Sequence, residues 1–139
     1  MIEPSFELGN TDGSGITTYG YDSADRLISK ATPAGTLSYT YDSAGHVASI
    51  SSSNMNGACV SYTYDPQGRL STVVDNRLPV GHSTTTYTYD DAYNVATVTY
   101  PNSLITAYTY DQLNRVTGAS TLHHQQLRLS ARSRVRISD

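Results

Sequence analysis

The sequence predicts an all-β protein made of tandem antiparallel hairpins. A four-residue motif, Tyr-x-Tyr-Asp, occurs five times in the 139 residues, with spacings of 20, 23, 25 and 21 positions from one motif Asp to the next. A turn residue and then Leu or Val follow each motif at nearly the same distance. No apolar spacing typical of an amphipathic helix occurs between residues 16 and 120. These three observations together favour strands joined by short turns.

The motif itself reads as the end of a strand. Two Tyr separated by one residue point to the same face of a strand, and Tyr and Thr both suit a pleated surface. The motifs hold ten of the twelve Tyr of the chain, so their rings are expected to pack hairpin against hairpin. The predicted repeat-motif residues, all structural, are Tyr19, Tyr21, Asp22, Tyr39, Tyr41, Asp42, Gly45, Tyr62, Tyr64, Asp65, Gly68, Arg69, Tyr87, Tyr89, Asp90, Tyr108, Tyr110 and Asp111.

Each motif Asp is predicted to begin a tight turn. Its side chain can accept a hydrogen bond from the backbone N–H two residues on, and Pro66 follows Asp65 at the position that a type I turn prefers. The five turns are expected at residues 22–26, 42–46, 65–69, 90–94 and 111–115.

The third residue after each Asp is predicted to need a left-handed backbone. Gly45 and Gly68 adopt this conformation at little cost, and Asp25 and Asn114 are the next most tolerant residues. The fourth copy has Tyr93 there, and we expect that hairpin to shift its left-handed residue to position 94.

The return strands, at residues 27–28, 47–50, 70–74 and 95–98, are short and break strict alternation. We therefore expect β-bulges or short strands. Each ends in turn residues such as Pro33-Ala34-Gly35 or Asn56-Gly57. The chain accordingly divides into a lead-in and turn (residues 1–15), five repeats (16–120) and a basic tail (121–139) that we expect to be disordered or truncated.

Charge and composition exclude several classes of partner. The net charge of −3 divides into −6 for residues 1–120 and +3 for residues 121–139. The main body therefore repels polyanions, and the tail lacks aromatic residues for base stacking, so no nucleic-acid partner is predicted. No apolar run reaches membrane-spanning length, no signal peptide is visible, and Cys59, the single cysteine, has no partner for an intramolecular disulfide.

Residues Tyr62 to Leu70 match the pattern Tyr-x-Tyr-Asp-x-x-Gly-Arg-Leu at every position. The chain thereby resembles the YD repeats of Rhs proteins, wall-associated bacterial toxins, toxin-complex C subunits and animal teneurins. In that family the repeats coil into a β-sheet spiral that can enclose a cargo, often a toxin. The resemblance implies an open segment of such a shell, with neighbouring YD repeats and an encapsulated toxin as partners and a secreted or cell-surface location.

No catalytic, cofactor or metal residues are predicted. The motif Asp residues recur in one register, whereas an acid–base pair needs two distinct environments. Adjacent His123 and His124 would point to opposite faces of a strand, and only Asn10-Thr11-Asp12-Gly13 approaches the spacing of a calcium loop. The sequence thus favours a non-catalytic structural module. A carbohydrate-binding module that uses the Tyr-rich β surface to bind a glycan is the alternative, and exposure of the Tyr pairs separates the two.

Overall fold

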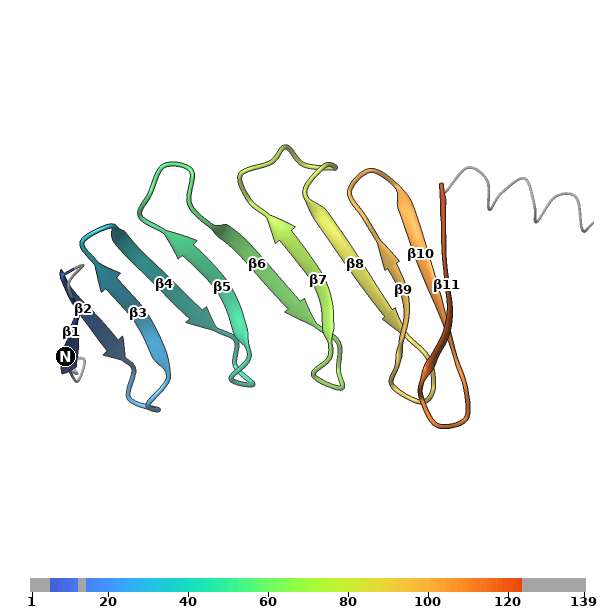
Figure 1. Cartoon of the computed structure of the whole chain (residues 1–139), viewed down its shortest axis with the longest axis horizontal. Coiled ribbons are helices and arrows are strands. Elements are labelled where there is room, and N and C mark those ends of the chain that lie inside the picture. Colours follow the sequence, from blue (N-terminus) through green and yellow to red (C-terminus); the bar gives the residue numbers. More distant parts are fainter. Residues whose placement is uncertain (1–5, 13–14, 124–139) are drawn as a thin grey trace, which may run out of the picture. The chain divides into compact units, whose positions relative to one another are not determined.

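The structure, a computed structural model, describes residues 6–12 and 15–123. The described residues form antiparallel strands and contain no helix (Figure 1), so the prediction of an all-β chain of hairpins is confirmed. The strands are β1 (Phe6–Asp12), β2 (Gly15–Tyr21), β3 (Leu27–Thr32), β4 (Gly35–Tyr41), β5 (Val47–Ser52), β6 (Cys59–Tyr64), β7 (Leu70–Asp75), β8 (Thr84–Tyr89), β9 (Val95–Thr99), β10 (Leu104–Tyr110) and β11 (Val116–His123).

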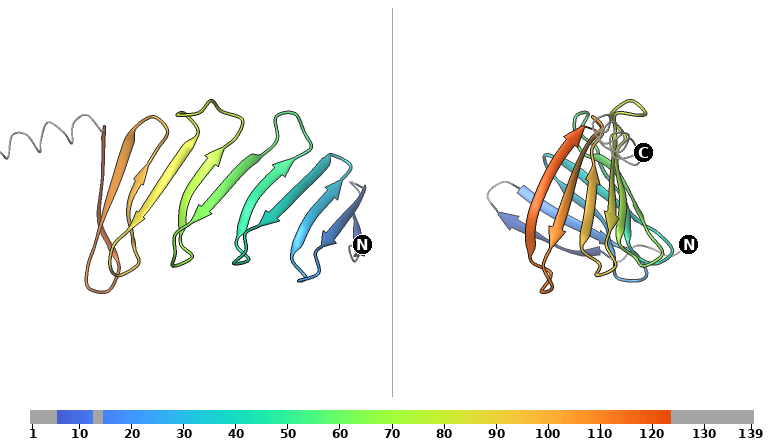
Figure 2. Two further views of the ribbon diagram at one scale, coloured as in Figure 1. Left: turned by 180° about the vertical axis from the view of Figure 1, so that it is seen from behind. Right: turned by 90° about the vertical axis from the view of Figure 1, so that its right-hand side faces the viewer.

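The chain divides into two compact units. The first comprises residues Met1–Thr63 and Asp75–Arg77, and the second comprises Tyr64–Val74 and Leu78–Asp139. In the first unit each strand from β1 to β6 pairs antiparallel with the next one in the sequence. In the second unit β7 to β11 follow the same rule and lie side by side in sequence order (Figure 2). Each unit is therefore an open antiparallel sheet.

The predicted bulges are confirmed, and they occur at one recurring place. In the β4–β5 hairpin Thr40 pairs with Ser49 but Tyr41 pairs with Val47, so Ala48 is an extra residue. The same register shift precedes the second motif Tyr in the β2–β3, β8–β9 and β10–β11 hairpins. A bulge increases the local twist of a strand and changes the direction of its side chains. These four hairpins therefore place their second motif Tyr with the same local geometry.

The sheet has little fully buried apolar surface. Among the described residues the only buried hydrophobic side chain is Val98, and it pairs with Tyr87 across β8 and β9. The motif Tyr residues are half-buried, whereas the Thr between the two Tyr is exposed in the last four copies. Stability therefore depends on rows of half-buried rings and on strand pairing more than on a closed core.

Hydroxyl pairs cross the strands on the face opposite the rings. Thr40 lies 2.6 Å from Ser49, Thr88 lies 2.6 Å from Thr97, and Thr109 lies 3.1 Å from Thr117, measured between side-chain oxygens. Cross-strand pairs of this kind each contribute a few tenths of a kcal/mol, roughly 0.2–1.

Strand pairing extends beyond the repeat boundaries that the sequence indicates. The lead-in, residues 1–15, contains β1, which pairs with β2. The tail boundary at residue 121 falls within β11, where Leu104 pairs with His123. The other tail residues, 124–139, lie outside the described residues.

Candidate functional site

The most regular chemical feature of the chain is the carboxylate that opens each turn. In all five turns the motif Asp accepts a hydrogen bond at Oδ1 from the backbone N–H two residues on, at 2.9–3.0 Å, as predicted. It also accepts the N–H four residues on, at 2.8–3.0 Å. Its own N–H donates to the carbonyl of that fourth residue, at 2.8–3.0 Å. The five turns predicted from the sequence are thereby confirmed.

The fourth residue after the Asp also binds it through its side chain. The Nε atoms of Arg26, Arg69 and Arg115 lie 2.8, 2.6 and 2.7 Å from Oδ2 of their motif Asp. His46 Nδ1 lies 3.0 Å from Asp42, and Asn94 Nδ2 donates to its Asp at 3.1 Å. One carboxylate oxygen therefore holds the turn and the other holds the side chain that follows it.

These bonds stabilise the charged form of the carboxylates. The backbone N–H of Arg26 contributes most to lowering the pKa of Asp22, and the bond from His46 contributes most for Asp42. For Asp65 the largest effect is desolvation, which raises the pKa, but the bonds from Arg69 and Gln67 together outweigh it and leave the pKa lowered.

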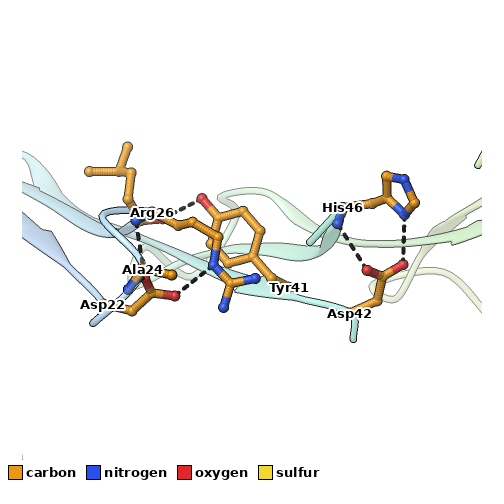
Figure 3. Close-up of polar contacts among 7 residues, drawn as sticks. Asp22, Ala24, Arg26, Tyr41, Asp42 and His46 are labelled. Carbon is orange, nitrogen blue, oxygen red and sulfur yellow. Dashed lines mark hydrogen bonds and ion pairs between the residues drawn. The ribbon is translucent and has the colours of Figure 1, made fainter. Parts of the chain in front are cut away.

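The Arg side chain reaches the next repeat. The Arg26 guanidinium lies 4.5 Å from the centre of the Tyr41 ring, and Arg69 lies 4.4 Å from that of Tyr89. Such cation–π contacts contribute about 0.5–2 kcal/mol depending on desolvation. We call the two sets Asp22–Arg26–Tyr41 and Asp65–Arg69–Tyr89 the Asp–Arg–Tyr clusters (Figure 3 shows the first).

The same Tyr closes the contact with a hydrogen bond. Tyr41 donates its hydroxyl to the carbonyl of Leu27 at 2.8 Å, and Tyr89 donates to the carbonyl of Leu70 at 2.8 Å. Tyr110 makes the equivalent bond to the carbonyl of Val95 at 2.9 Å. In that preceding repeat Asn94 occupies the position that Arg26 and Arg69 have in theirs. In each case the acceptor is the first residue of the return strand of the preceding repeat. The second motif Tyr therefore joins successive repeats within each unit.

The first motif Tyr packs across its own hairpin. Tyr39 pairs with Ile50, Tyr87 with Val98 and Tyr108 with Ala119. Tyr19 pairs with Lys30, whose ammonium lies 5.9 Å from the ring centre. Tyr62 is half-buried on β6. The structure thus places the first Tyr within a repeat and the second between repeats.

The left-handed positions follow the prediction except in the fourth turn. Asp25, Gly45, Gly68 and Asn114 have φ of 57°, 90°, 77° and 59°. Tyr93 has a φ of 68°, so the expected shift to position 94 is wrong. The reason is that Asn94 donates its backbone and side-chain N–H groups to Asp90. These bonds keep the fourth turn in the common register despite the steric cost at Tyr93.

The ten motif Tyr residues are less exposed than the two Tyr residues outside the motifs. Tyr93 is 66% exposed and Tyr100 is 39% exposed, and both lie outside the motifs. The predicted alternative of a glycan surface on the Tyr rows therefore lacks exposed motif rings to support it.

The geometry of the described residues can also be compared with the acid–base and metal chemistry that the sequence disfavours. The motif Asp residues share one bonding pattern, so no two of them have the contrasting environments of a general acid and base. Within residues 6–12 and 15–123, no group of three His, Cys, Asp or Glu side chains is placed to hold a metal ion. The side chains of Asn10 and Asp12, and all of His124, lie outside the described residues. The described part of the chain likewise contains no helix that could span a membrane.

Sequence reasoning missed the role of the residue four positions after the Asp. It identified Arg69 as a motif residue but treated that position otherwise as merely polar. The signal was present, because three of the five copies have Arg there. The Tyr ring that this Arg contacts lies in the next repeat. The number of residues between the two varies with the length of the connection, so the sequence does not indicate the pairing.

Comparisons with known proteins agree with this architecture. Residues 5–138 match the family described as Teneurin YD-shell. The fold is similar to a solved structure titled "Crystal Structure of TcdB2-TccC3-Cdc42", with a TM-score of 0.63 and 22% sequence identity. That match covers 81% of this chain and 6% of the other, so this chain spans a small part of the length of the protein it matches. No curated protein matches the sequence.

Proposed function

We propose that this chain, which belongs to the teneurin YD-shell family, is a non-catalytic wall segment of a β-sheet shell. The observation that supports this most directly is the recurring contact between successive repeats. Three repeats offer a Tyr hydroxyl to a carbonyl of the repeat before them, through Tyr41, Tyr89 and Tyr110. The side of a repeat that carries this Tyr is complementary to the side that carries the return-strand carbonyl. Repeats can therefore be added in series without a new type of interface.

The two faces of the sheet suit a wall. The ring face is half-buried and apolar, whereas the other face carries exposed, paired hydroxyls such as Thr40–Ser49 and Thr88–Thr97. We propose that the shell encloses a polypeptide cargo, a toxin or other effector, in an exported or cell-surface protein of the Rhs type. The family membership supports this role for the whole protein, of which the chain would form one part of the wall.

Protease protection tests the proposal. In the full-length protein that contains this segment, the cargo should resist a protease that digests it rapidly when it is expressed alone. The double variant Arg69→Met and Tyr89→Phe removes one contact between repeats and should speed cargo digestion. Tyr100→Phe, on a partly exposed loop ring, is the matched control. Equal digestion of free and shell-borne cargo would contradict the enclosing role.

A further inference from the structure

Successive motif turns lie next to one another within each unit, and the same two positions face each other at every junction of this kind. One position is the residue four after the motif Asp, whose side chain binds that Asp. The other is the left-handed residue of the next turn. The three pairs are Arg26 with Gly45, Arg69 with Tyr93 and Asn94 with Asn114.

The first and third pairs differ in chemistry, and in both the two residues are matched. A Cβ at Gly45 would lie 3.8 Å from Nη1 of Arg26, so the glycine leaves the space around this guanidinium free. Asn94 Nδ2, in contrast, donates a hydrogen bond to Oδ1 of Asn114 at 3.0 Å. Each left-handed residue therefore suits the side chain that the preceding repeat presents to it.

The second pair accounts for the unusual residue of the fourth turn. Tyr93 has a φ of 68°, a conformation in which a bulky side chain is strained. Burial does not offset the strain, because 66% of Tyr93 is exposed. The Arg69 guanidinium lies 5.0 Å from the centre of its ring, and this attraction is one that Gly or Asn would lack.

The turn itself does not require these different side chains. Gly45, Tyr93 and Asn114 have φ of 90°, 68° and 59°, and each donates its N–H to the carbonyl of its motif Asp at 3.0–3.1 Å. One backbone conformation therefore carries three kinds of side chain. What varies with the side chain is the residue opposite it in the preceding repeat.

We propose that the left-handed residue of a motif turn is a specificity position, which recognises the residue four after the Asp in the preceding repeat. An Arg in the preceding repeat selects Gly or an aromatic residue, whereas an Asn selects Asn. This inference rests on the proposed function, in which repeats are added in series along a wall, and it states which repeats can be neighbours. Arg115, in the last turn, accordingly selects a further repeat with Gly or an aromatic residue at this position.

A double-mutant cycle on the whole chain tests the Arg69–Tyr93 pair. Urea unfolding gives the equilibrium constant of unfolding for the parent, Tyr93→Asn, Arg69→Ala and the double variant. With Arg69 present, Tyr93→Asn relieves the strained backbone but loses the cation–π contact, whereas in the Arg69→Ala background only the relief remains. Tyr93→Asn should therefore lower the unfolding constant more in that background, by about two- to fivefold.

The last turn supplies the matched control. Arg115→Ala removes the same kind of ion pair with a motif Asp, but the described residues show no contact between Arg115 and Tyr93. Its effect should therefore be additive with that of Tyr93→Asn.

Transfer of the Arg–Tyr pair to the next junction tests the selection itself. Asn114→Tyr alone places a strained ring opposite Asn94 and removes the acceptor of its amide, so the unfolding constant should rise. In the Asn94→Arg background the guanidinium can bind Asp90, as Arg69 binds Asp65, and can lie against the ring. The rise caused by Asn114→Tyr should then be at least about twofold smaller. These variants leave Arg69 unchanged, so they decide the matter even if Arg69→Ala prevents folding.

Additive effects at both junctions would overturn the proposal, because each residue would then act independently of the repeat before it. Coupling of equal size between Tyr93→Asn and Arg115→Ala would also overturn it, since loss of any positive charge would then have the same effect. Cargo protection tests the wall function separately. Coupling without protection would contradict the wall function, and protection without coupling would contradict the specificity position alone.

Discussion

At the scale of single residues, the motif Asp performs two tasks with two oxygens. In the third turn, Asp65 Oδ1 accepts the N–H groups of Gln67 and Arg69, and Oδ2 binds the Arg69 side chain. An Asn could retain the first task but would lose the charge that the second requires. This explains why Asp suits the three turns in which Arg26, Arg69 and Arg115 bind the second oxygen.

The left-handed residue is the most sterically demanding position of each turn. Gly68 has a φ of 77°, which a β-branched side chain adopts only with strain. Gly68→Val is expected to reduce the free energy of unfolding by roughly 1–2 kcal/mol. Chemical denaturation of the parent and the variant measures this difference. Gln67→Val, at the neighbouring exposed position, is the control, and equal losses in the two variants would contradict the assignment.

Asp75 provides a test of pH dependence. The bond from the Arg77 side chain, at 2.6 Å, lowers the pKa of Asp75 to about 2. Because the pKa is lower in the folded chain than in the unfolded one, this contribution is present above about pH 4 and is lost as the pH falls toward 2. The Tm difference between the parent and Asp75→Asn should therefore shrink over this range. A difference that stays constant from pH 5 to about 2 would count against the ion pair.

The sequence predicts features of single residues well where a local conformational preference decides the outcome. The Asp caps and four left-handed residues follow from the preferences of Asp, Gly and Asn. Tyr93 departs from the preference of Tyr for a negative φ because Asn94 bonds to Asp90 through its backbone and its side chain. Cooperative hydrogen bonding in the turn outweighs the strain of one residue.

At the scale of elements, the bulge before the second Tyr sets the contact between hairpins. It brings the Tyr89 hydroxyl to the Leu70 carbonyl at 2.8 Å and the ring to Arg69. Burial of this ring is the largest cause of the raised pKa of Tyr89. The hairpins are therefore joined by side chains in addition to the ladder of backbone bonds.

Removing one hydroxyl tests the hydrogen bond by itself. Tyr89→Phe keeps the ring over Arg69 but leaves the Leu70 carbonyl without this donor, so the free energy of unfolding should fall by about 1 kcal/mol. Tyr100→Phe should change it little, because Tyr100 is 39% exposed and donates no hydroxyl bond among the described residues. If Tyr89→Phe and the parent are equally stable in urea, the Tyr89–Leu70 hydrogen bond does not help to hold successive repeats together.

Bulges could be predicted from the sequence, but their partners could not. Failed alternation in residues 47–50 indicates an irregular strand without saying which residue is extra. The Arg26–Tyr41 contact joins residues whose separation depends on the length of an intervening connection. Contacts within a hairpin follow from local pattern, whereas contacts between hairpins depend on the register that the turns establish.

At the scale of the whole chain, β11 leaves an open edge in the part that the structure describes. It pairs with β10 on one side, and no described strand pairs with the other. Arg115 binds Asp111, yet no ring lies over it among the described residues and its side chain is 73% exposed, compared with 26% for Arg69. The last hairpin thus presents the same groups that earlier hairpins use to contact the next repeat.

The sequence predicted the hairpin order because the repeat is periodic. It did not predict β1 or the end of β11, which lack the motif. Those segments become strands because they pair with β2 and β10, and tertiary pairing decides strand formation where local preference is weak.

The open edge leads to a prediction about association. β11 contains no charged residue that would discourage pairing, and Val116 and Leu122 are 59% and 42% exposed. The purified chain should therefore associate as its concentration rises, and Val116→Lys should shift this association to higher concentration. Val80→Lys makes the same change at a fully exposed loop position and should have little effect. Sedimentation velocity across a concentration series distinguishes these outcomes. If the parent stays monomeric throughout, the edge of β11 is covered in solution, and the picture of an open sheet end must be abandoned.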